Sequence, residues 1–466
     1  MKGRMNVARK TMTQEEKVNY MITKDVRPLI CELAVPTIIS MLVTAFYNMA
    51  DTFFVGKLNT QSTAAVGIVF TVMALIQAFG FFYGQGSGNY ISRKLGAREY
   101  DDAAVMASTG FFMAIFTGIL IAILGLVFLE PLSVFLGSTP TILPYTKAYL
   151  RIILIGAPFI MSSFVLNNQL RFQGSASYAM VGIVTGAIVN VVLDPIFIFV
   201  FDMGVAGAAL ATVLSQMVSF SLLCVGSAKG GNIRISIKKF QPSIPILWEM
   251  GRGGFPSLCR QGLASVSGML MNHAAGTYGG VYGDAAIAAM SIVTRVSMFA
   301  NSALIGFGQG FQPVCGMNFG AKKYERVREG FWFCVKYSFA FLIIISVLGG
   351  IFAEQIITVF RKEDMEVIRI GTLALRFQCV SFPLSAWIVM CNMMLQSMGI
   401  AGKASLISAA RQGLFFIPFL FILTHFCGLF GVQICQPVSD IGAFLLAVPI
   451  GISELNKMKQ IEKNLQ

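Results

Sequence analysis

The sequence predicts an all-α polytopic membrane protein with twelve transmembrane helices in two six-helix lobes, related by a pseudo-two-fold axis along the membrane normal. Apolar stretches long enough to cross a bilayer recur from residue 29 to residue 452. Hydrophobic residues make up 56% of the 466-residue chain, only 12% are charged, and the mean hydropathy is +0.72. This composition excludes an ordinary soluble protein. Motifs of the first half also return in the second half, which indicates an internal duplication.

The duplication is visible in short motifs at a constant spacing. Gly-Gln-Gly at residues 84–86 returns 224 positions later at residues 308–310, and Leu-Gly-Ala at residues 95–97 has the counterpart Phe-Gly-Ala at residues 319–321. A period this long indicates duplication of a whole lobe, because solenoid repeats have periods of 20–50 residues. Six is an even number, so both lobes begin on the same side of the membrane. A substrate is then expected to lie between the lobes.

The first lobe is predicted to cover residues 29–226, after a cytoplasmic tail at residues 1–28. Each of its spans is an apolar run bounded by polar or turn-forming residues. The six spans are residues 29–55, 63–90, 104–128, 141–165, 176–200 and 204–226. Pro36, Pro158 and Pro195 lie inside three of them, and each removes one backbone N–H, which bends a helix.

A cytoplasmic connector is predicted at residues 227–247, between the lobes. It carries four cationic residues together with Pro242 and Pro245, which interrupt regular structure. The alternating run at residues 233–238 is compatible with a short strand, but a segment lying along the membrane surface is the preferred interpretation.

The second lobe is predicted at residues 248–453, followed by a short cytoplasmic tail at residues 454–466. It repeats the pattern of the first lobe, again with prolines inside several spans. Its six spans are residues 248–276, 285–313, 329–353, 367–393, 404–424 and 429–452.

The net charge of +13 reflects the orientation of the chain rather than binding to nucleic acid. With the N-terminus inside, the cytoplasmic segments hold 23 Lys and Arg residues, Arg171 among them, and the outer loops hold three. Cytoplasmic loops of membrane proteins carry such an excess of cations. Both termini are therefore expected in the cytoplasm, with these cations facing anionic lipid.

Acidic residues inside the spans are the sharpest functional signal, because a carboxylate near mid-bilayer costs about 2.5–3.5 kcal/mol. Asp51 in the first span and Asp194 in the fifth both lie within about 10 Å of the outer ends of their helices, at a rise of 1.5 Å per residue. Asn190 precedes Asp194 by one turn, and Thr212 of the sixth span reaches a similar depth. These oxygen-bearing side chains suit Na⁺ or shared protons. The alternative is that Asp51 is solvated and Asp194 pairs locally.

These residues also carry a family resemblance. Pro36, the segment Asn48–Gly56 with its Asp-Thr pair, the segment Asn190–Pro195, and the segment Gly204–Ala209 followed by Thr212 resemble the multidrug and toxic compound extrusion (MATE) family, most closely its MepA-like bacterial members. The resemblance covers nearly the whole chain. It implies a cation site in the first lobe made by Asp51, Asn190, Asp194 and Thr212, with Na⁺ or H⁺ as the coupling ion.

The second lobe offers weaker candidates. Some relatives in the family carry a glutamate in the seventh helix and an aspartate in the tenth, but here the seventh span reads Pro-Ser-Leu-Cys-Arg-Gln at residues 256–261 and the tenth has no acid. Asp440, with Arg260 and Gln261, is a candidate polar site of this lobe. Asp440 either serves such a site or pairs with a cation such as Arg411.

The function expected from these observations is secondary active multidrug efflux. Na⁺ or H⁺ from outside would be exchanged for amphipathic, often cationic, drugs or toxic organic cations by a monomer in the bacterial plasma membrane. Membrane lipids are the other expected partner. One alternative is a lipid-linked sugar flippase of the same superfamily, which predicts a basic central groove, and another is a non-transporting receptor or channel. We expect no enzymatic activity and no organic cofactor, because no nucleophile–base pair, metal-ligand cluster or phosphate loop is recognisable in the sequence.

Overall fold

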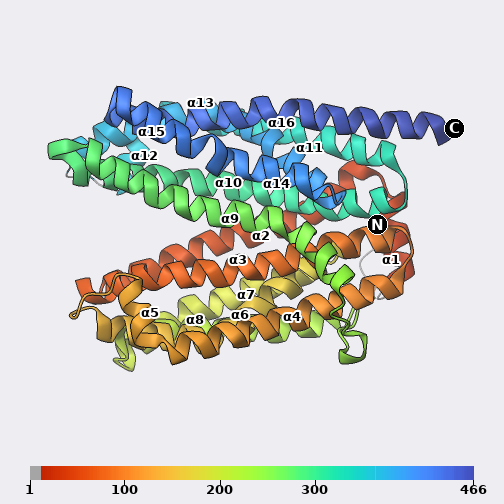
Figure 1. Cartoon of the computed structure of the whole chain (residues 1–466), viewed down its shortest axis with the longest axis horizontal. Helices are drawn as coiled ribbons and strands as arrows, with labels where there is room; N and C mark the ends of the chain where they lie inside the picture. The colour runs from red at the N-terminus through yellow and green to blue at the C-terminus, as the bar shows by residue number, and fades with distance from the viewer. Residues whose placement is uncertain (1–11, 361, 363, 466) are drawn as a thin grey trace, which may run out of the picture.

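A computed structural model of the chain describes residues 12–360, 362 and 364–465, and within these residues the regular structure is helical throughout. Figure 1 shows two bundles of long helices side by side, with both termini at the same end of the molecule. We call that end the terminal face and the opposite end the loop face. Eleven helical segments among the described residues are long and apolar enough to cross a membrane.

The first lobe is preceded by a short helix, α1 (Gln14–Thr23), whose first turn is closed by reciprocal hydrogen bonds between Thr13 and Glu16. The long helices of this lobe match the predicted spans: the first four extend three to seven residues beyond the apolar run at one end or both, and the last two end within one residue of it. They are α2 (Val26–Gly56), α3 (Thr60–Gly96), α4 (Tyr100–Val127), the short α5 (Leu129–Phe135), α6 (Leu143–Phe172), α7 (Ala176–Pro195) with the π-helical turn η1 (Ile196–Val200), and α8 (Gly204–Ser227).

The second lobe repeats this order after the connector, which contains one 3₁₀ turn, η2 (Ile237–Lys239). Its helices are α9 (Ile244–Tyr278), the 3₁₀ turn η3 (Gly280–Tyr282), α10 (Gly283–Gly320), α11 (Tyr324–Ile351), the short α12 (Ala353–Phe360), α13 (Met365–Ser397), α14 (Ala401–Ala409) with the π-helical turn η4 (Ala410–Leu414), α15 (Phe416–Cys427), and α16 (Leu429–Leu465). The seventh predicted span, in α9, is long enough to cross a membrane but is not among the eleven apolar segments; polar residues are spread along this helix, Glu249, Arg252 and Arg260 among them.

The connector does not form the strand that its alternation allowed. Residues 233–236 run without regular structure and are held by side chains of the first lobe: the Ile233 amide donates to Gln173 Oε1 (2.7 Å) and the Ser236 amide donates to Ser108 Oγ (3.1 Å). Side-chain acceptors therefore satisfy backbone groups that a strand partner would otherwise bind.

Both predicted tails contain helix. Residues 1–11 lie outside the described part of the chain, but residues 14–23 form α1, and residues 454–465 continue α16. The extension of α16 is stabilised by the ion pairs of Glu454 with Lys403 (2.5 Å) and of Arg328 with Glu462. The predicted spans contained apolar stretches alone, so they ended where the helices become polar, and the helical parts of the tails were not predicted.

The lobes approach most closely near the terminal face and lie apart at the loop face (Figure 1). Glycines allow the close approach: a Cβ atom on Gly96 would lie 1.9 Å from the Met317 carbonyl oxygen, and one on Gly320 would lie 2.0 Å from the Arg93 carbonyl oxygen. Such distances exclude any side chain at either glycine without movement of the backbone. We call this contact of α2, α3 and the end of α6 with α9 and α10 the seam.

Candidate cation-coupling site

The predicted first-lobe site lies where α2, α7 and α8 pack together near the loop face. Asp51 is near the end of α2, and Asp194 is near the end of α7, directly before Pro195. Pro195 cannot donate a backbone hydrogen bond, and the chain changes there from α-helix to the π-helical turn η1. Such irregular turns are frequent at functional sites. The local sequence therefore places Asp194 at a break in its helix.

All four predicted residues lie in this region. Asn190, Asp194 and Thr212 are 1%, 0% and 5% exposed, and Asp51 is half-buried. Asn190 Nδ2 donates to Thr212 Oγ1 over 3.5 Å, which ties α7 to α8. The charge of Asp51 also acts on Asp194, so the two carboxylates lie near one another across the contact of α2 with α7.

The site contains buried oxygen atoms that accept no hydrogen bond from the described residues. Asp51 Oδ1, Asn190 Oδ1 and both carboxylate oxygens of Asp194 are buried, and none of them has a partner among the described residues. Buried polar atoms are nearly always hydrogen-bonded, and an unpaired one costs about 1–3 kcal/mol, more when it is charged. Four such oxygens in one region form a buried site that lacks a positively charged or proton-donating partner among the described residues.

Two tyrosines that were not predicted complete the surroundings. The charges of Asp51 and Asp194 both act on the phenols of Tyr47 and Tyr149, and Tyr149 lies beside Thr212. Tyr47 precedes Asp51 by one helical turn, so a helical wheel identifies it. Tyr149 belongs to α6, which lies far from the other residues in sequence, and only the packing of the helices reveals it.

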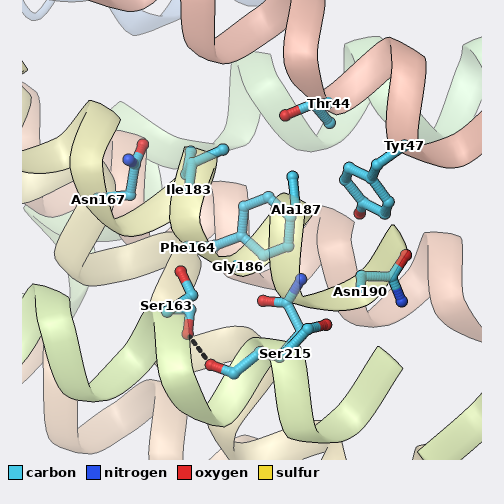
Figure 2. Close-up of a pocket in the computed structure, with 12 residues that line it drawn as sticks. Thr44, Tyr47, Ser163, Phe164, Asn167, Ile183, Gly186, Ala187, Asn190 and Ser215 are labelled. Atoms are coloured by element: carbon cyan, nitrogen blue, oxygen red, sulfur yellow. Dashed lines mark hydrogen bonds between the residues drawn. The ribbon is translucent and has the colours of Figure 1, made fainter. Parts of the chain in front are cut away.

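A small cavity, with several hydroxyl and amide groups among its lining residues, continues from this site toward the terminal face. Figure 2 shows Thr44 and Tyr47 of α2 facing it from one side, with Asn190 of α7 and Ser215 of α8 also at its wall. The cavity measures about 40 Å³, which is enough for a water molecule. Side-chain hydroxyl and amide groups therefore line the interior of the first lobe below the carboxylates.

The donor set limits the chemistry to hard cations or protons. Among the described residues no group of three or more His, Cys, Asp or Glu side chains gathers in one place, so the arrangement differs from a transition-metal site. Two carboxylates, an amide oxygen and a hydroxyl can provide oxygen ligands to Na⁺, or the carboxylates can share a proton.

In the second lobe the Asp440 carboxylate already accepts hydrogen bonds from several protein side chains. Its carboxylate accepts from Arg411 Nε (2.8 Å), Gln436 Nε2 (2.9 Å) and Ser381 Oγ (3.0 Å), and a longer contact of 3.4 Å reaches Gln378 Nε2. Asp440 is fully buried, and the ion pair balances its charge. The pairing with Arg411 was one of the two interpretations left open by the sequence.

The other two candidates of this lobe do not join Asp440. Within the described residues no hydrogen bond or ion pair connects Arg260 or Gln261 with its carboxylate, whose polar contacts come from α13, η4 and α16. The three predicted residues therefore do not form one polar cluster.

Arg171 does not lie on the membrane surface, where the sequence analysis placed it. Its side chain is 1% exposed and forms part of the seam, where Nη1 donates to Gln309 Oε1 and Nη2 donates to Asn168 Oδ1, each over 2.6 Å. The prediction was wrong because the fourth span was ended at residue 165, whereas α6 continues to Phe172.

A larger apolar cavity of about 570 Å³ lies between α2 and the second-lobe helices. Four phenylalanines and several aliphatic residues line it, with Leu42 as the contribution of α2. Its size falls in the range of pockets that hold drug-sized molecules. The phenylalanines are Phe299, Phe341, Phe352 and Phe382.

Comparison with known proteins gives one consistent family. The family model described as MatE matches residues 36–196 and 256–422. The multidrug export protein MepA of Staphylococcus haemolyticus is 27% identical over 447 residues, covering 96% of this chain and 97% of that protein.

Two solved structures show the same fold over nearly the full length. One is an outward-facing conformation of a multidrug resistance MATE family transporter, with a TM-score of 0.89 and 28% identity, covering 97% of this chain and 100% of that chain. The other is a transporter from Pyrococcus furiosus whose binding pocket is described as having reverse polarity, suggesting a different function. Its TM-score is 0.88 at 28% identity, covering 95% of this chain and 98% of that chain.

Proposed function

Because this chain belongs to the MatE family of multidrug efflux transporters, we propose that it is a secondary active exporter that exchanges external Na⁺ or H⁺ for amphipathic organic substrates. The observation that carries the proposal is the set of four buried, unpartnered oxygens at Asp51, Asn190 and Asp194. A site that lacks only a positive charge can bind a cation and release it again.

The cationic residues at the terminal face support an orientation with both termini in the cytoplasm of a bacterial cell. In that orientation the seam closes the cytoplasmic side, and Asp51 and Asp194 lie toward the outside. The structure then corresponds to an outward-facing state. External cations would enter from the side of the membrane nearer to the carboxylates, driven by the membrane potential, which supplies about 2.3 kcal/mol per charge at 100 mV.

Helix α2 is the element that would connect cation binding with movement of the lobes. Its outer end carries Asp51, whereas its inner half is fixed to α10 by the hydrogen bond from Thr37 Oγ1 to the Gly306 carbonyl oxygen (2.6 Å). A Cβ atom on Gly310 would lie 2.5 Å from Ala34 Cα, so the two helices touch through their backbones. Pro36 lies within this fixed half and permits a bend. A pull on Asp51 toward Asp194 would therefore be transmitted to the second lobe.

The apolar cavity beside α2 would hold the hydrophobic part of a substrate. Its phenylalanine rings can stack against varied aromatic compounds, which suits a transporter of many drugs.

The proposal is tested by ethidium transport in proteoliposomes under separately imposed Na⁺ and pH gradients. Wild-type protein should transport ethidium in response to one of these gradients. Asp51→Asn and Asp194→Asn should both reduce gradient-driven transport to the background level, because a neutral amide cannot compensate the charge of the ion. Asp284→Asn, which changes an exposed acid near the loop face, is the matched control and should behave as wild type. Unchanged ethidium transport by both site variants would contradict the proposal.

A further inference from the structure

The guanidinium group of Arg171 connects the two lobes inside the seam. Its Nη1 donates to Gln309 Oε1 of α10 over 2.6 Å, and the two residues are only 1% and 2% exposed. Two further contacts stay within the first lobe: Nη2 donates to Asn168 Oδ1, and Cζ lies 5.3 Å from the centroid of the Phe172 ring. Opening of the seam therefore breaks the hydrogen bond to Gln309 and leaves the contacts with Asn168 and Phe172 intact.

The charge of Arg171 has no acidic partner while the seam is closed. Among the described residues no ion pair includes its guanidinium group, and its Nε is buried without an acceptor. Burying a charge without a counter-charge is unfavourable, and the aromatic face of Phe172 compensates only part of that cost. Water can hydrate the guanidinium group once the seam opens. Hydration therefore offsets the loss of the hydrogen bond to Gln309, which makes closure of the seam reversible.

The neutral acceptor determines how firmly the seam is held. A buried ion pair is costly to break because two opposite charges are left unpaired, whereas a hydrogen bond to an amide leaves no second charge behind. Arg93 of α3 also crosses the seam to a neutral acceptor, the Ser397 carbonyl oxygen, over 3.1 Å. The ion pair of Arg27 with Glu329 joins the lobes as well, but both side chains are exposed, so it contributes little.

The second lobe shows that the fold does not require a cation at this position. The same hydrogen bond occurs in both lobes 225 residues apart, from Asn167 to the Ala179 carbonyl oxygen and from Asn392 to the Ala404 carbonyl oxygen. At this offset Gln396 of α13 corresponds to Arg171. Gln396 Nε2 donates to the Gly253 carbonyl oxygen and to Ser257 Oγ, each over 2.9 Å and both within its own lobe. The charge and the contact across the seam are therefore specific to Arg171.

We propose that Arg171 is a gating residue of the terminal face. It holds the seam closed through the Gln309 amide in the state shown here, and it exchanges that amide for water when the seam opens. The proposal rests on the proposed function, which requires the terminal face to open in each transport cycle. Arg171 acts by positioning the lobes relative to one another, without contact with the coupling ion or the substrate.

Two variants that give Arg171 a counter-charge on opposite sides of the seam test the proposal. Gln309→Glu places a carboxylate on the second lobe, so its ion pair with Arg171 crosses the seam. Asn168→Asp is the matched control, because it places a carboxylate on the first lobe, where the ion pair moves together with Arg171. Both changes replace an amide whose oxygen already accepts from the guanidinium group over 2.6 Å.

The readout is the alkylation rate of the buried Cys315 of α10 in the full chain in nanodiscs, with the other eight cysteines replaced. Gln309→Glu should slow alkylation about tenfold or more, because opening must now separate two buried opposite charges. Asn168→Asp should not slow it, and Arg171→Gln added to Gln309→Glu should reverse the slowing. The thermal midpoint is measured as well. Both carboxylate variants should raise it, since each balances the buried charge, so a merely structural role of Arg171 would not separate them.

Equal alkylation rates of the wild-type and Gln309→Glu proteins, or equal slowing in both carboxylate variants, would overturn the gating role. Gradient-driven ethidium transport is measured in parallel and should be lost in Gln309→Glu but kept in Asn168→Asp. Slowed alkylation with undiminished transport in Gln309→Glu would also overturn it. Transport by wild-type protein together with unchanged alkylation in Gln309→Glu refutes only the gate. Slowed alkylation in Gln309→Glu, when wild-type protein transports no ethidium under either gradient, refutes only the exporter.

Discussion

At the scale of single residues, the two lobes differ in whether a buried carboxylate has hydrogen-bond donors. Asp194 has no hydrogen-bond donor for either carboxylate oxygen, whereas Asp440, equally buried, is bound by Arg411 and neighbouring polar side chains. An unpaired buried carboxylate destabilises a fold, and a complete ion pair does not leave such a deficit. The first arrangement suits exchange of an ion, and the second suits a permanent structural role.

The unpaired state of Asp194 predicts ion-dependent stability. In wild-type protein the thermal midpoint should rise with added Na⁺ or with acidification, because an ion that binds only the folded state stabilises it. Asp194→Asn removes the uncompensated charge, so the thermal midpoint of this variant should change neither with Na⁺ nor with acidification. It should also be at least as high as the midpoint of wild-type protein measured without added Na⁺ or acid. Differential scanning fluorimetry in detergent measures this. A variant that keeps the full ion response would show that another residue binds the ion.

The ion pair of Asp440 predicts the opposite result in the second lobe. Asp440→Asn leaves the largely buried guanidinium of Arg411 without a counter-charge, which should destabilise the protein by about 3–5 kcal/mol while leaving the ion dependence of the midpoint unchanged. Thermal unfolding with and without Na⁺ and at two pH values distinguishes the effects. Loss of the ion response in this variant would mean that the second lobe takes part in coupling.

At the scale of elements, α1 connects both lobes at the terminal face. Lys17 Nζ donates to Ser175 Oγ of the first lobe and to Asn232 Oδ1 of the connector, each over 2.6 Å, and the Met21 carbonyl oxygen accepts from Asn318 Nδ2 in the second lobe (3.2 Å). A helix attached to both lobes must loosen on one side before the seam opens. Docking of α1 thus favours the state described here.

The docking of α1 should depend on pH. Burial lowers the pKa of Lys17 from 10.5 to about 8. Between pH 8 and pH 10.5 the undocked lysine binds a proton that the docked lysine has lost, so docking strengthens as the pH rises through this range and is weakest below pH 8. Hydrogen exchange in α1, corrected for the intrinsic rate, should slow over this range in the wild type. Lys17→Met lacks the titrating group, and a persistent pH dependence in that variant would contradict the assignment.

The close backbone contact at Gly96 of α3 predicts that a side chain at this position opens the seam. In Gly96→Ala the added Cβ atom meets the Met317 carbonyl oxygen, whereas nothing lies within 4 Å of a Cβ atom on Gly67 of the same helix. Gly96→Ala should open the seam and increase the alkylation rate of the buried Cys315, in a background whose other eight cysteines are replaced. Gly67→Ala is the control. Equal alkylation rates in both variants would show that the seam does not depend on this contact.

At the scale of the whole molecule, the sequence predicted the fold well because its signals are properties of single segments. Apolar runs placed the helices, and the duplication predicted the two lobes. The rarity of acids inside a membrane drew attention to Asp51 and Asp194 as candidates, and their role stays a prediction. The helical tails were missed because polar helix ends carry no hydropathy signal. The start of α1 could have been predicted, because Thr13 followed by Glu16 three residues later is the sequence pattern of a capping box. Contacts between distant helices could not be predicted, which is why Tyr149 and the seam contact of Arg171 with Gln309 appeared only in the structure.

The central claim is that an ion at Asp51 and Asp194 moves in one direction while a substrate moves in the other. It is tested most directly by imposing an ethidium gradient across proteoliposomes and recording ²²Na⁺ flux and the internal pH. The account predicts that the ethidium gradient alone drives Na⁺ or H⁺ in the opposite direction in wild-type protein, and that Asp194→Asn abolishes this counterflow. Ethidium movement without any counterflow, or identical counterflow in the variant, would contradict it.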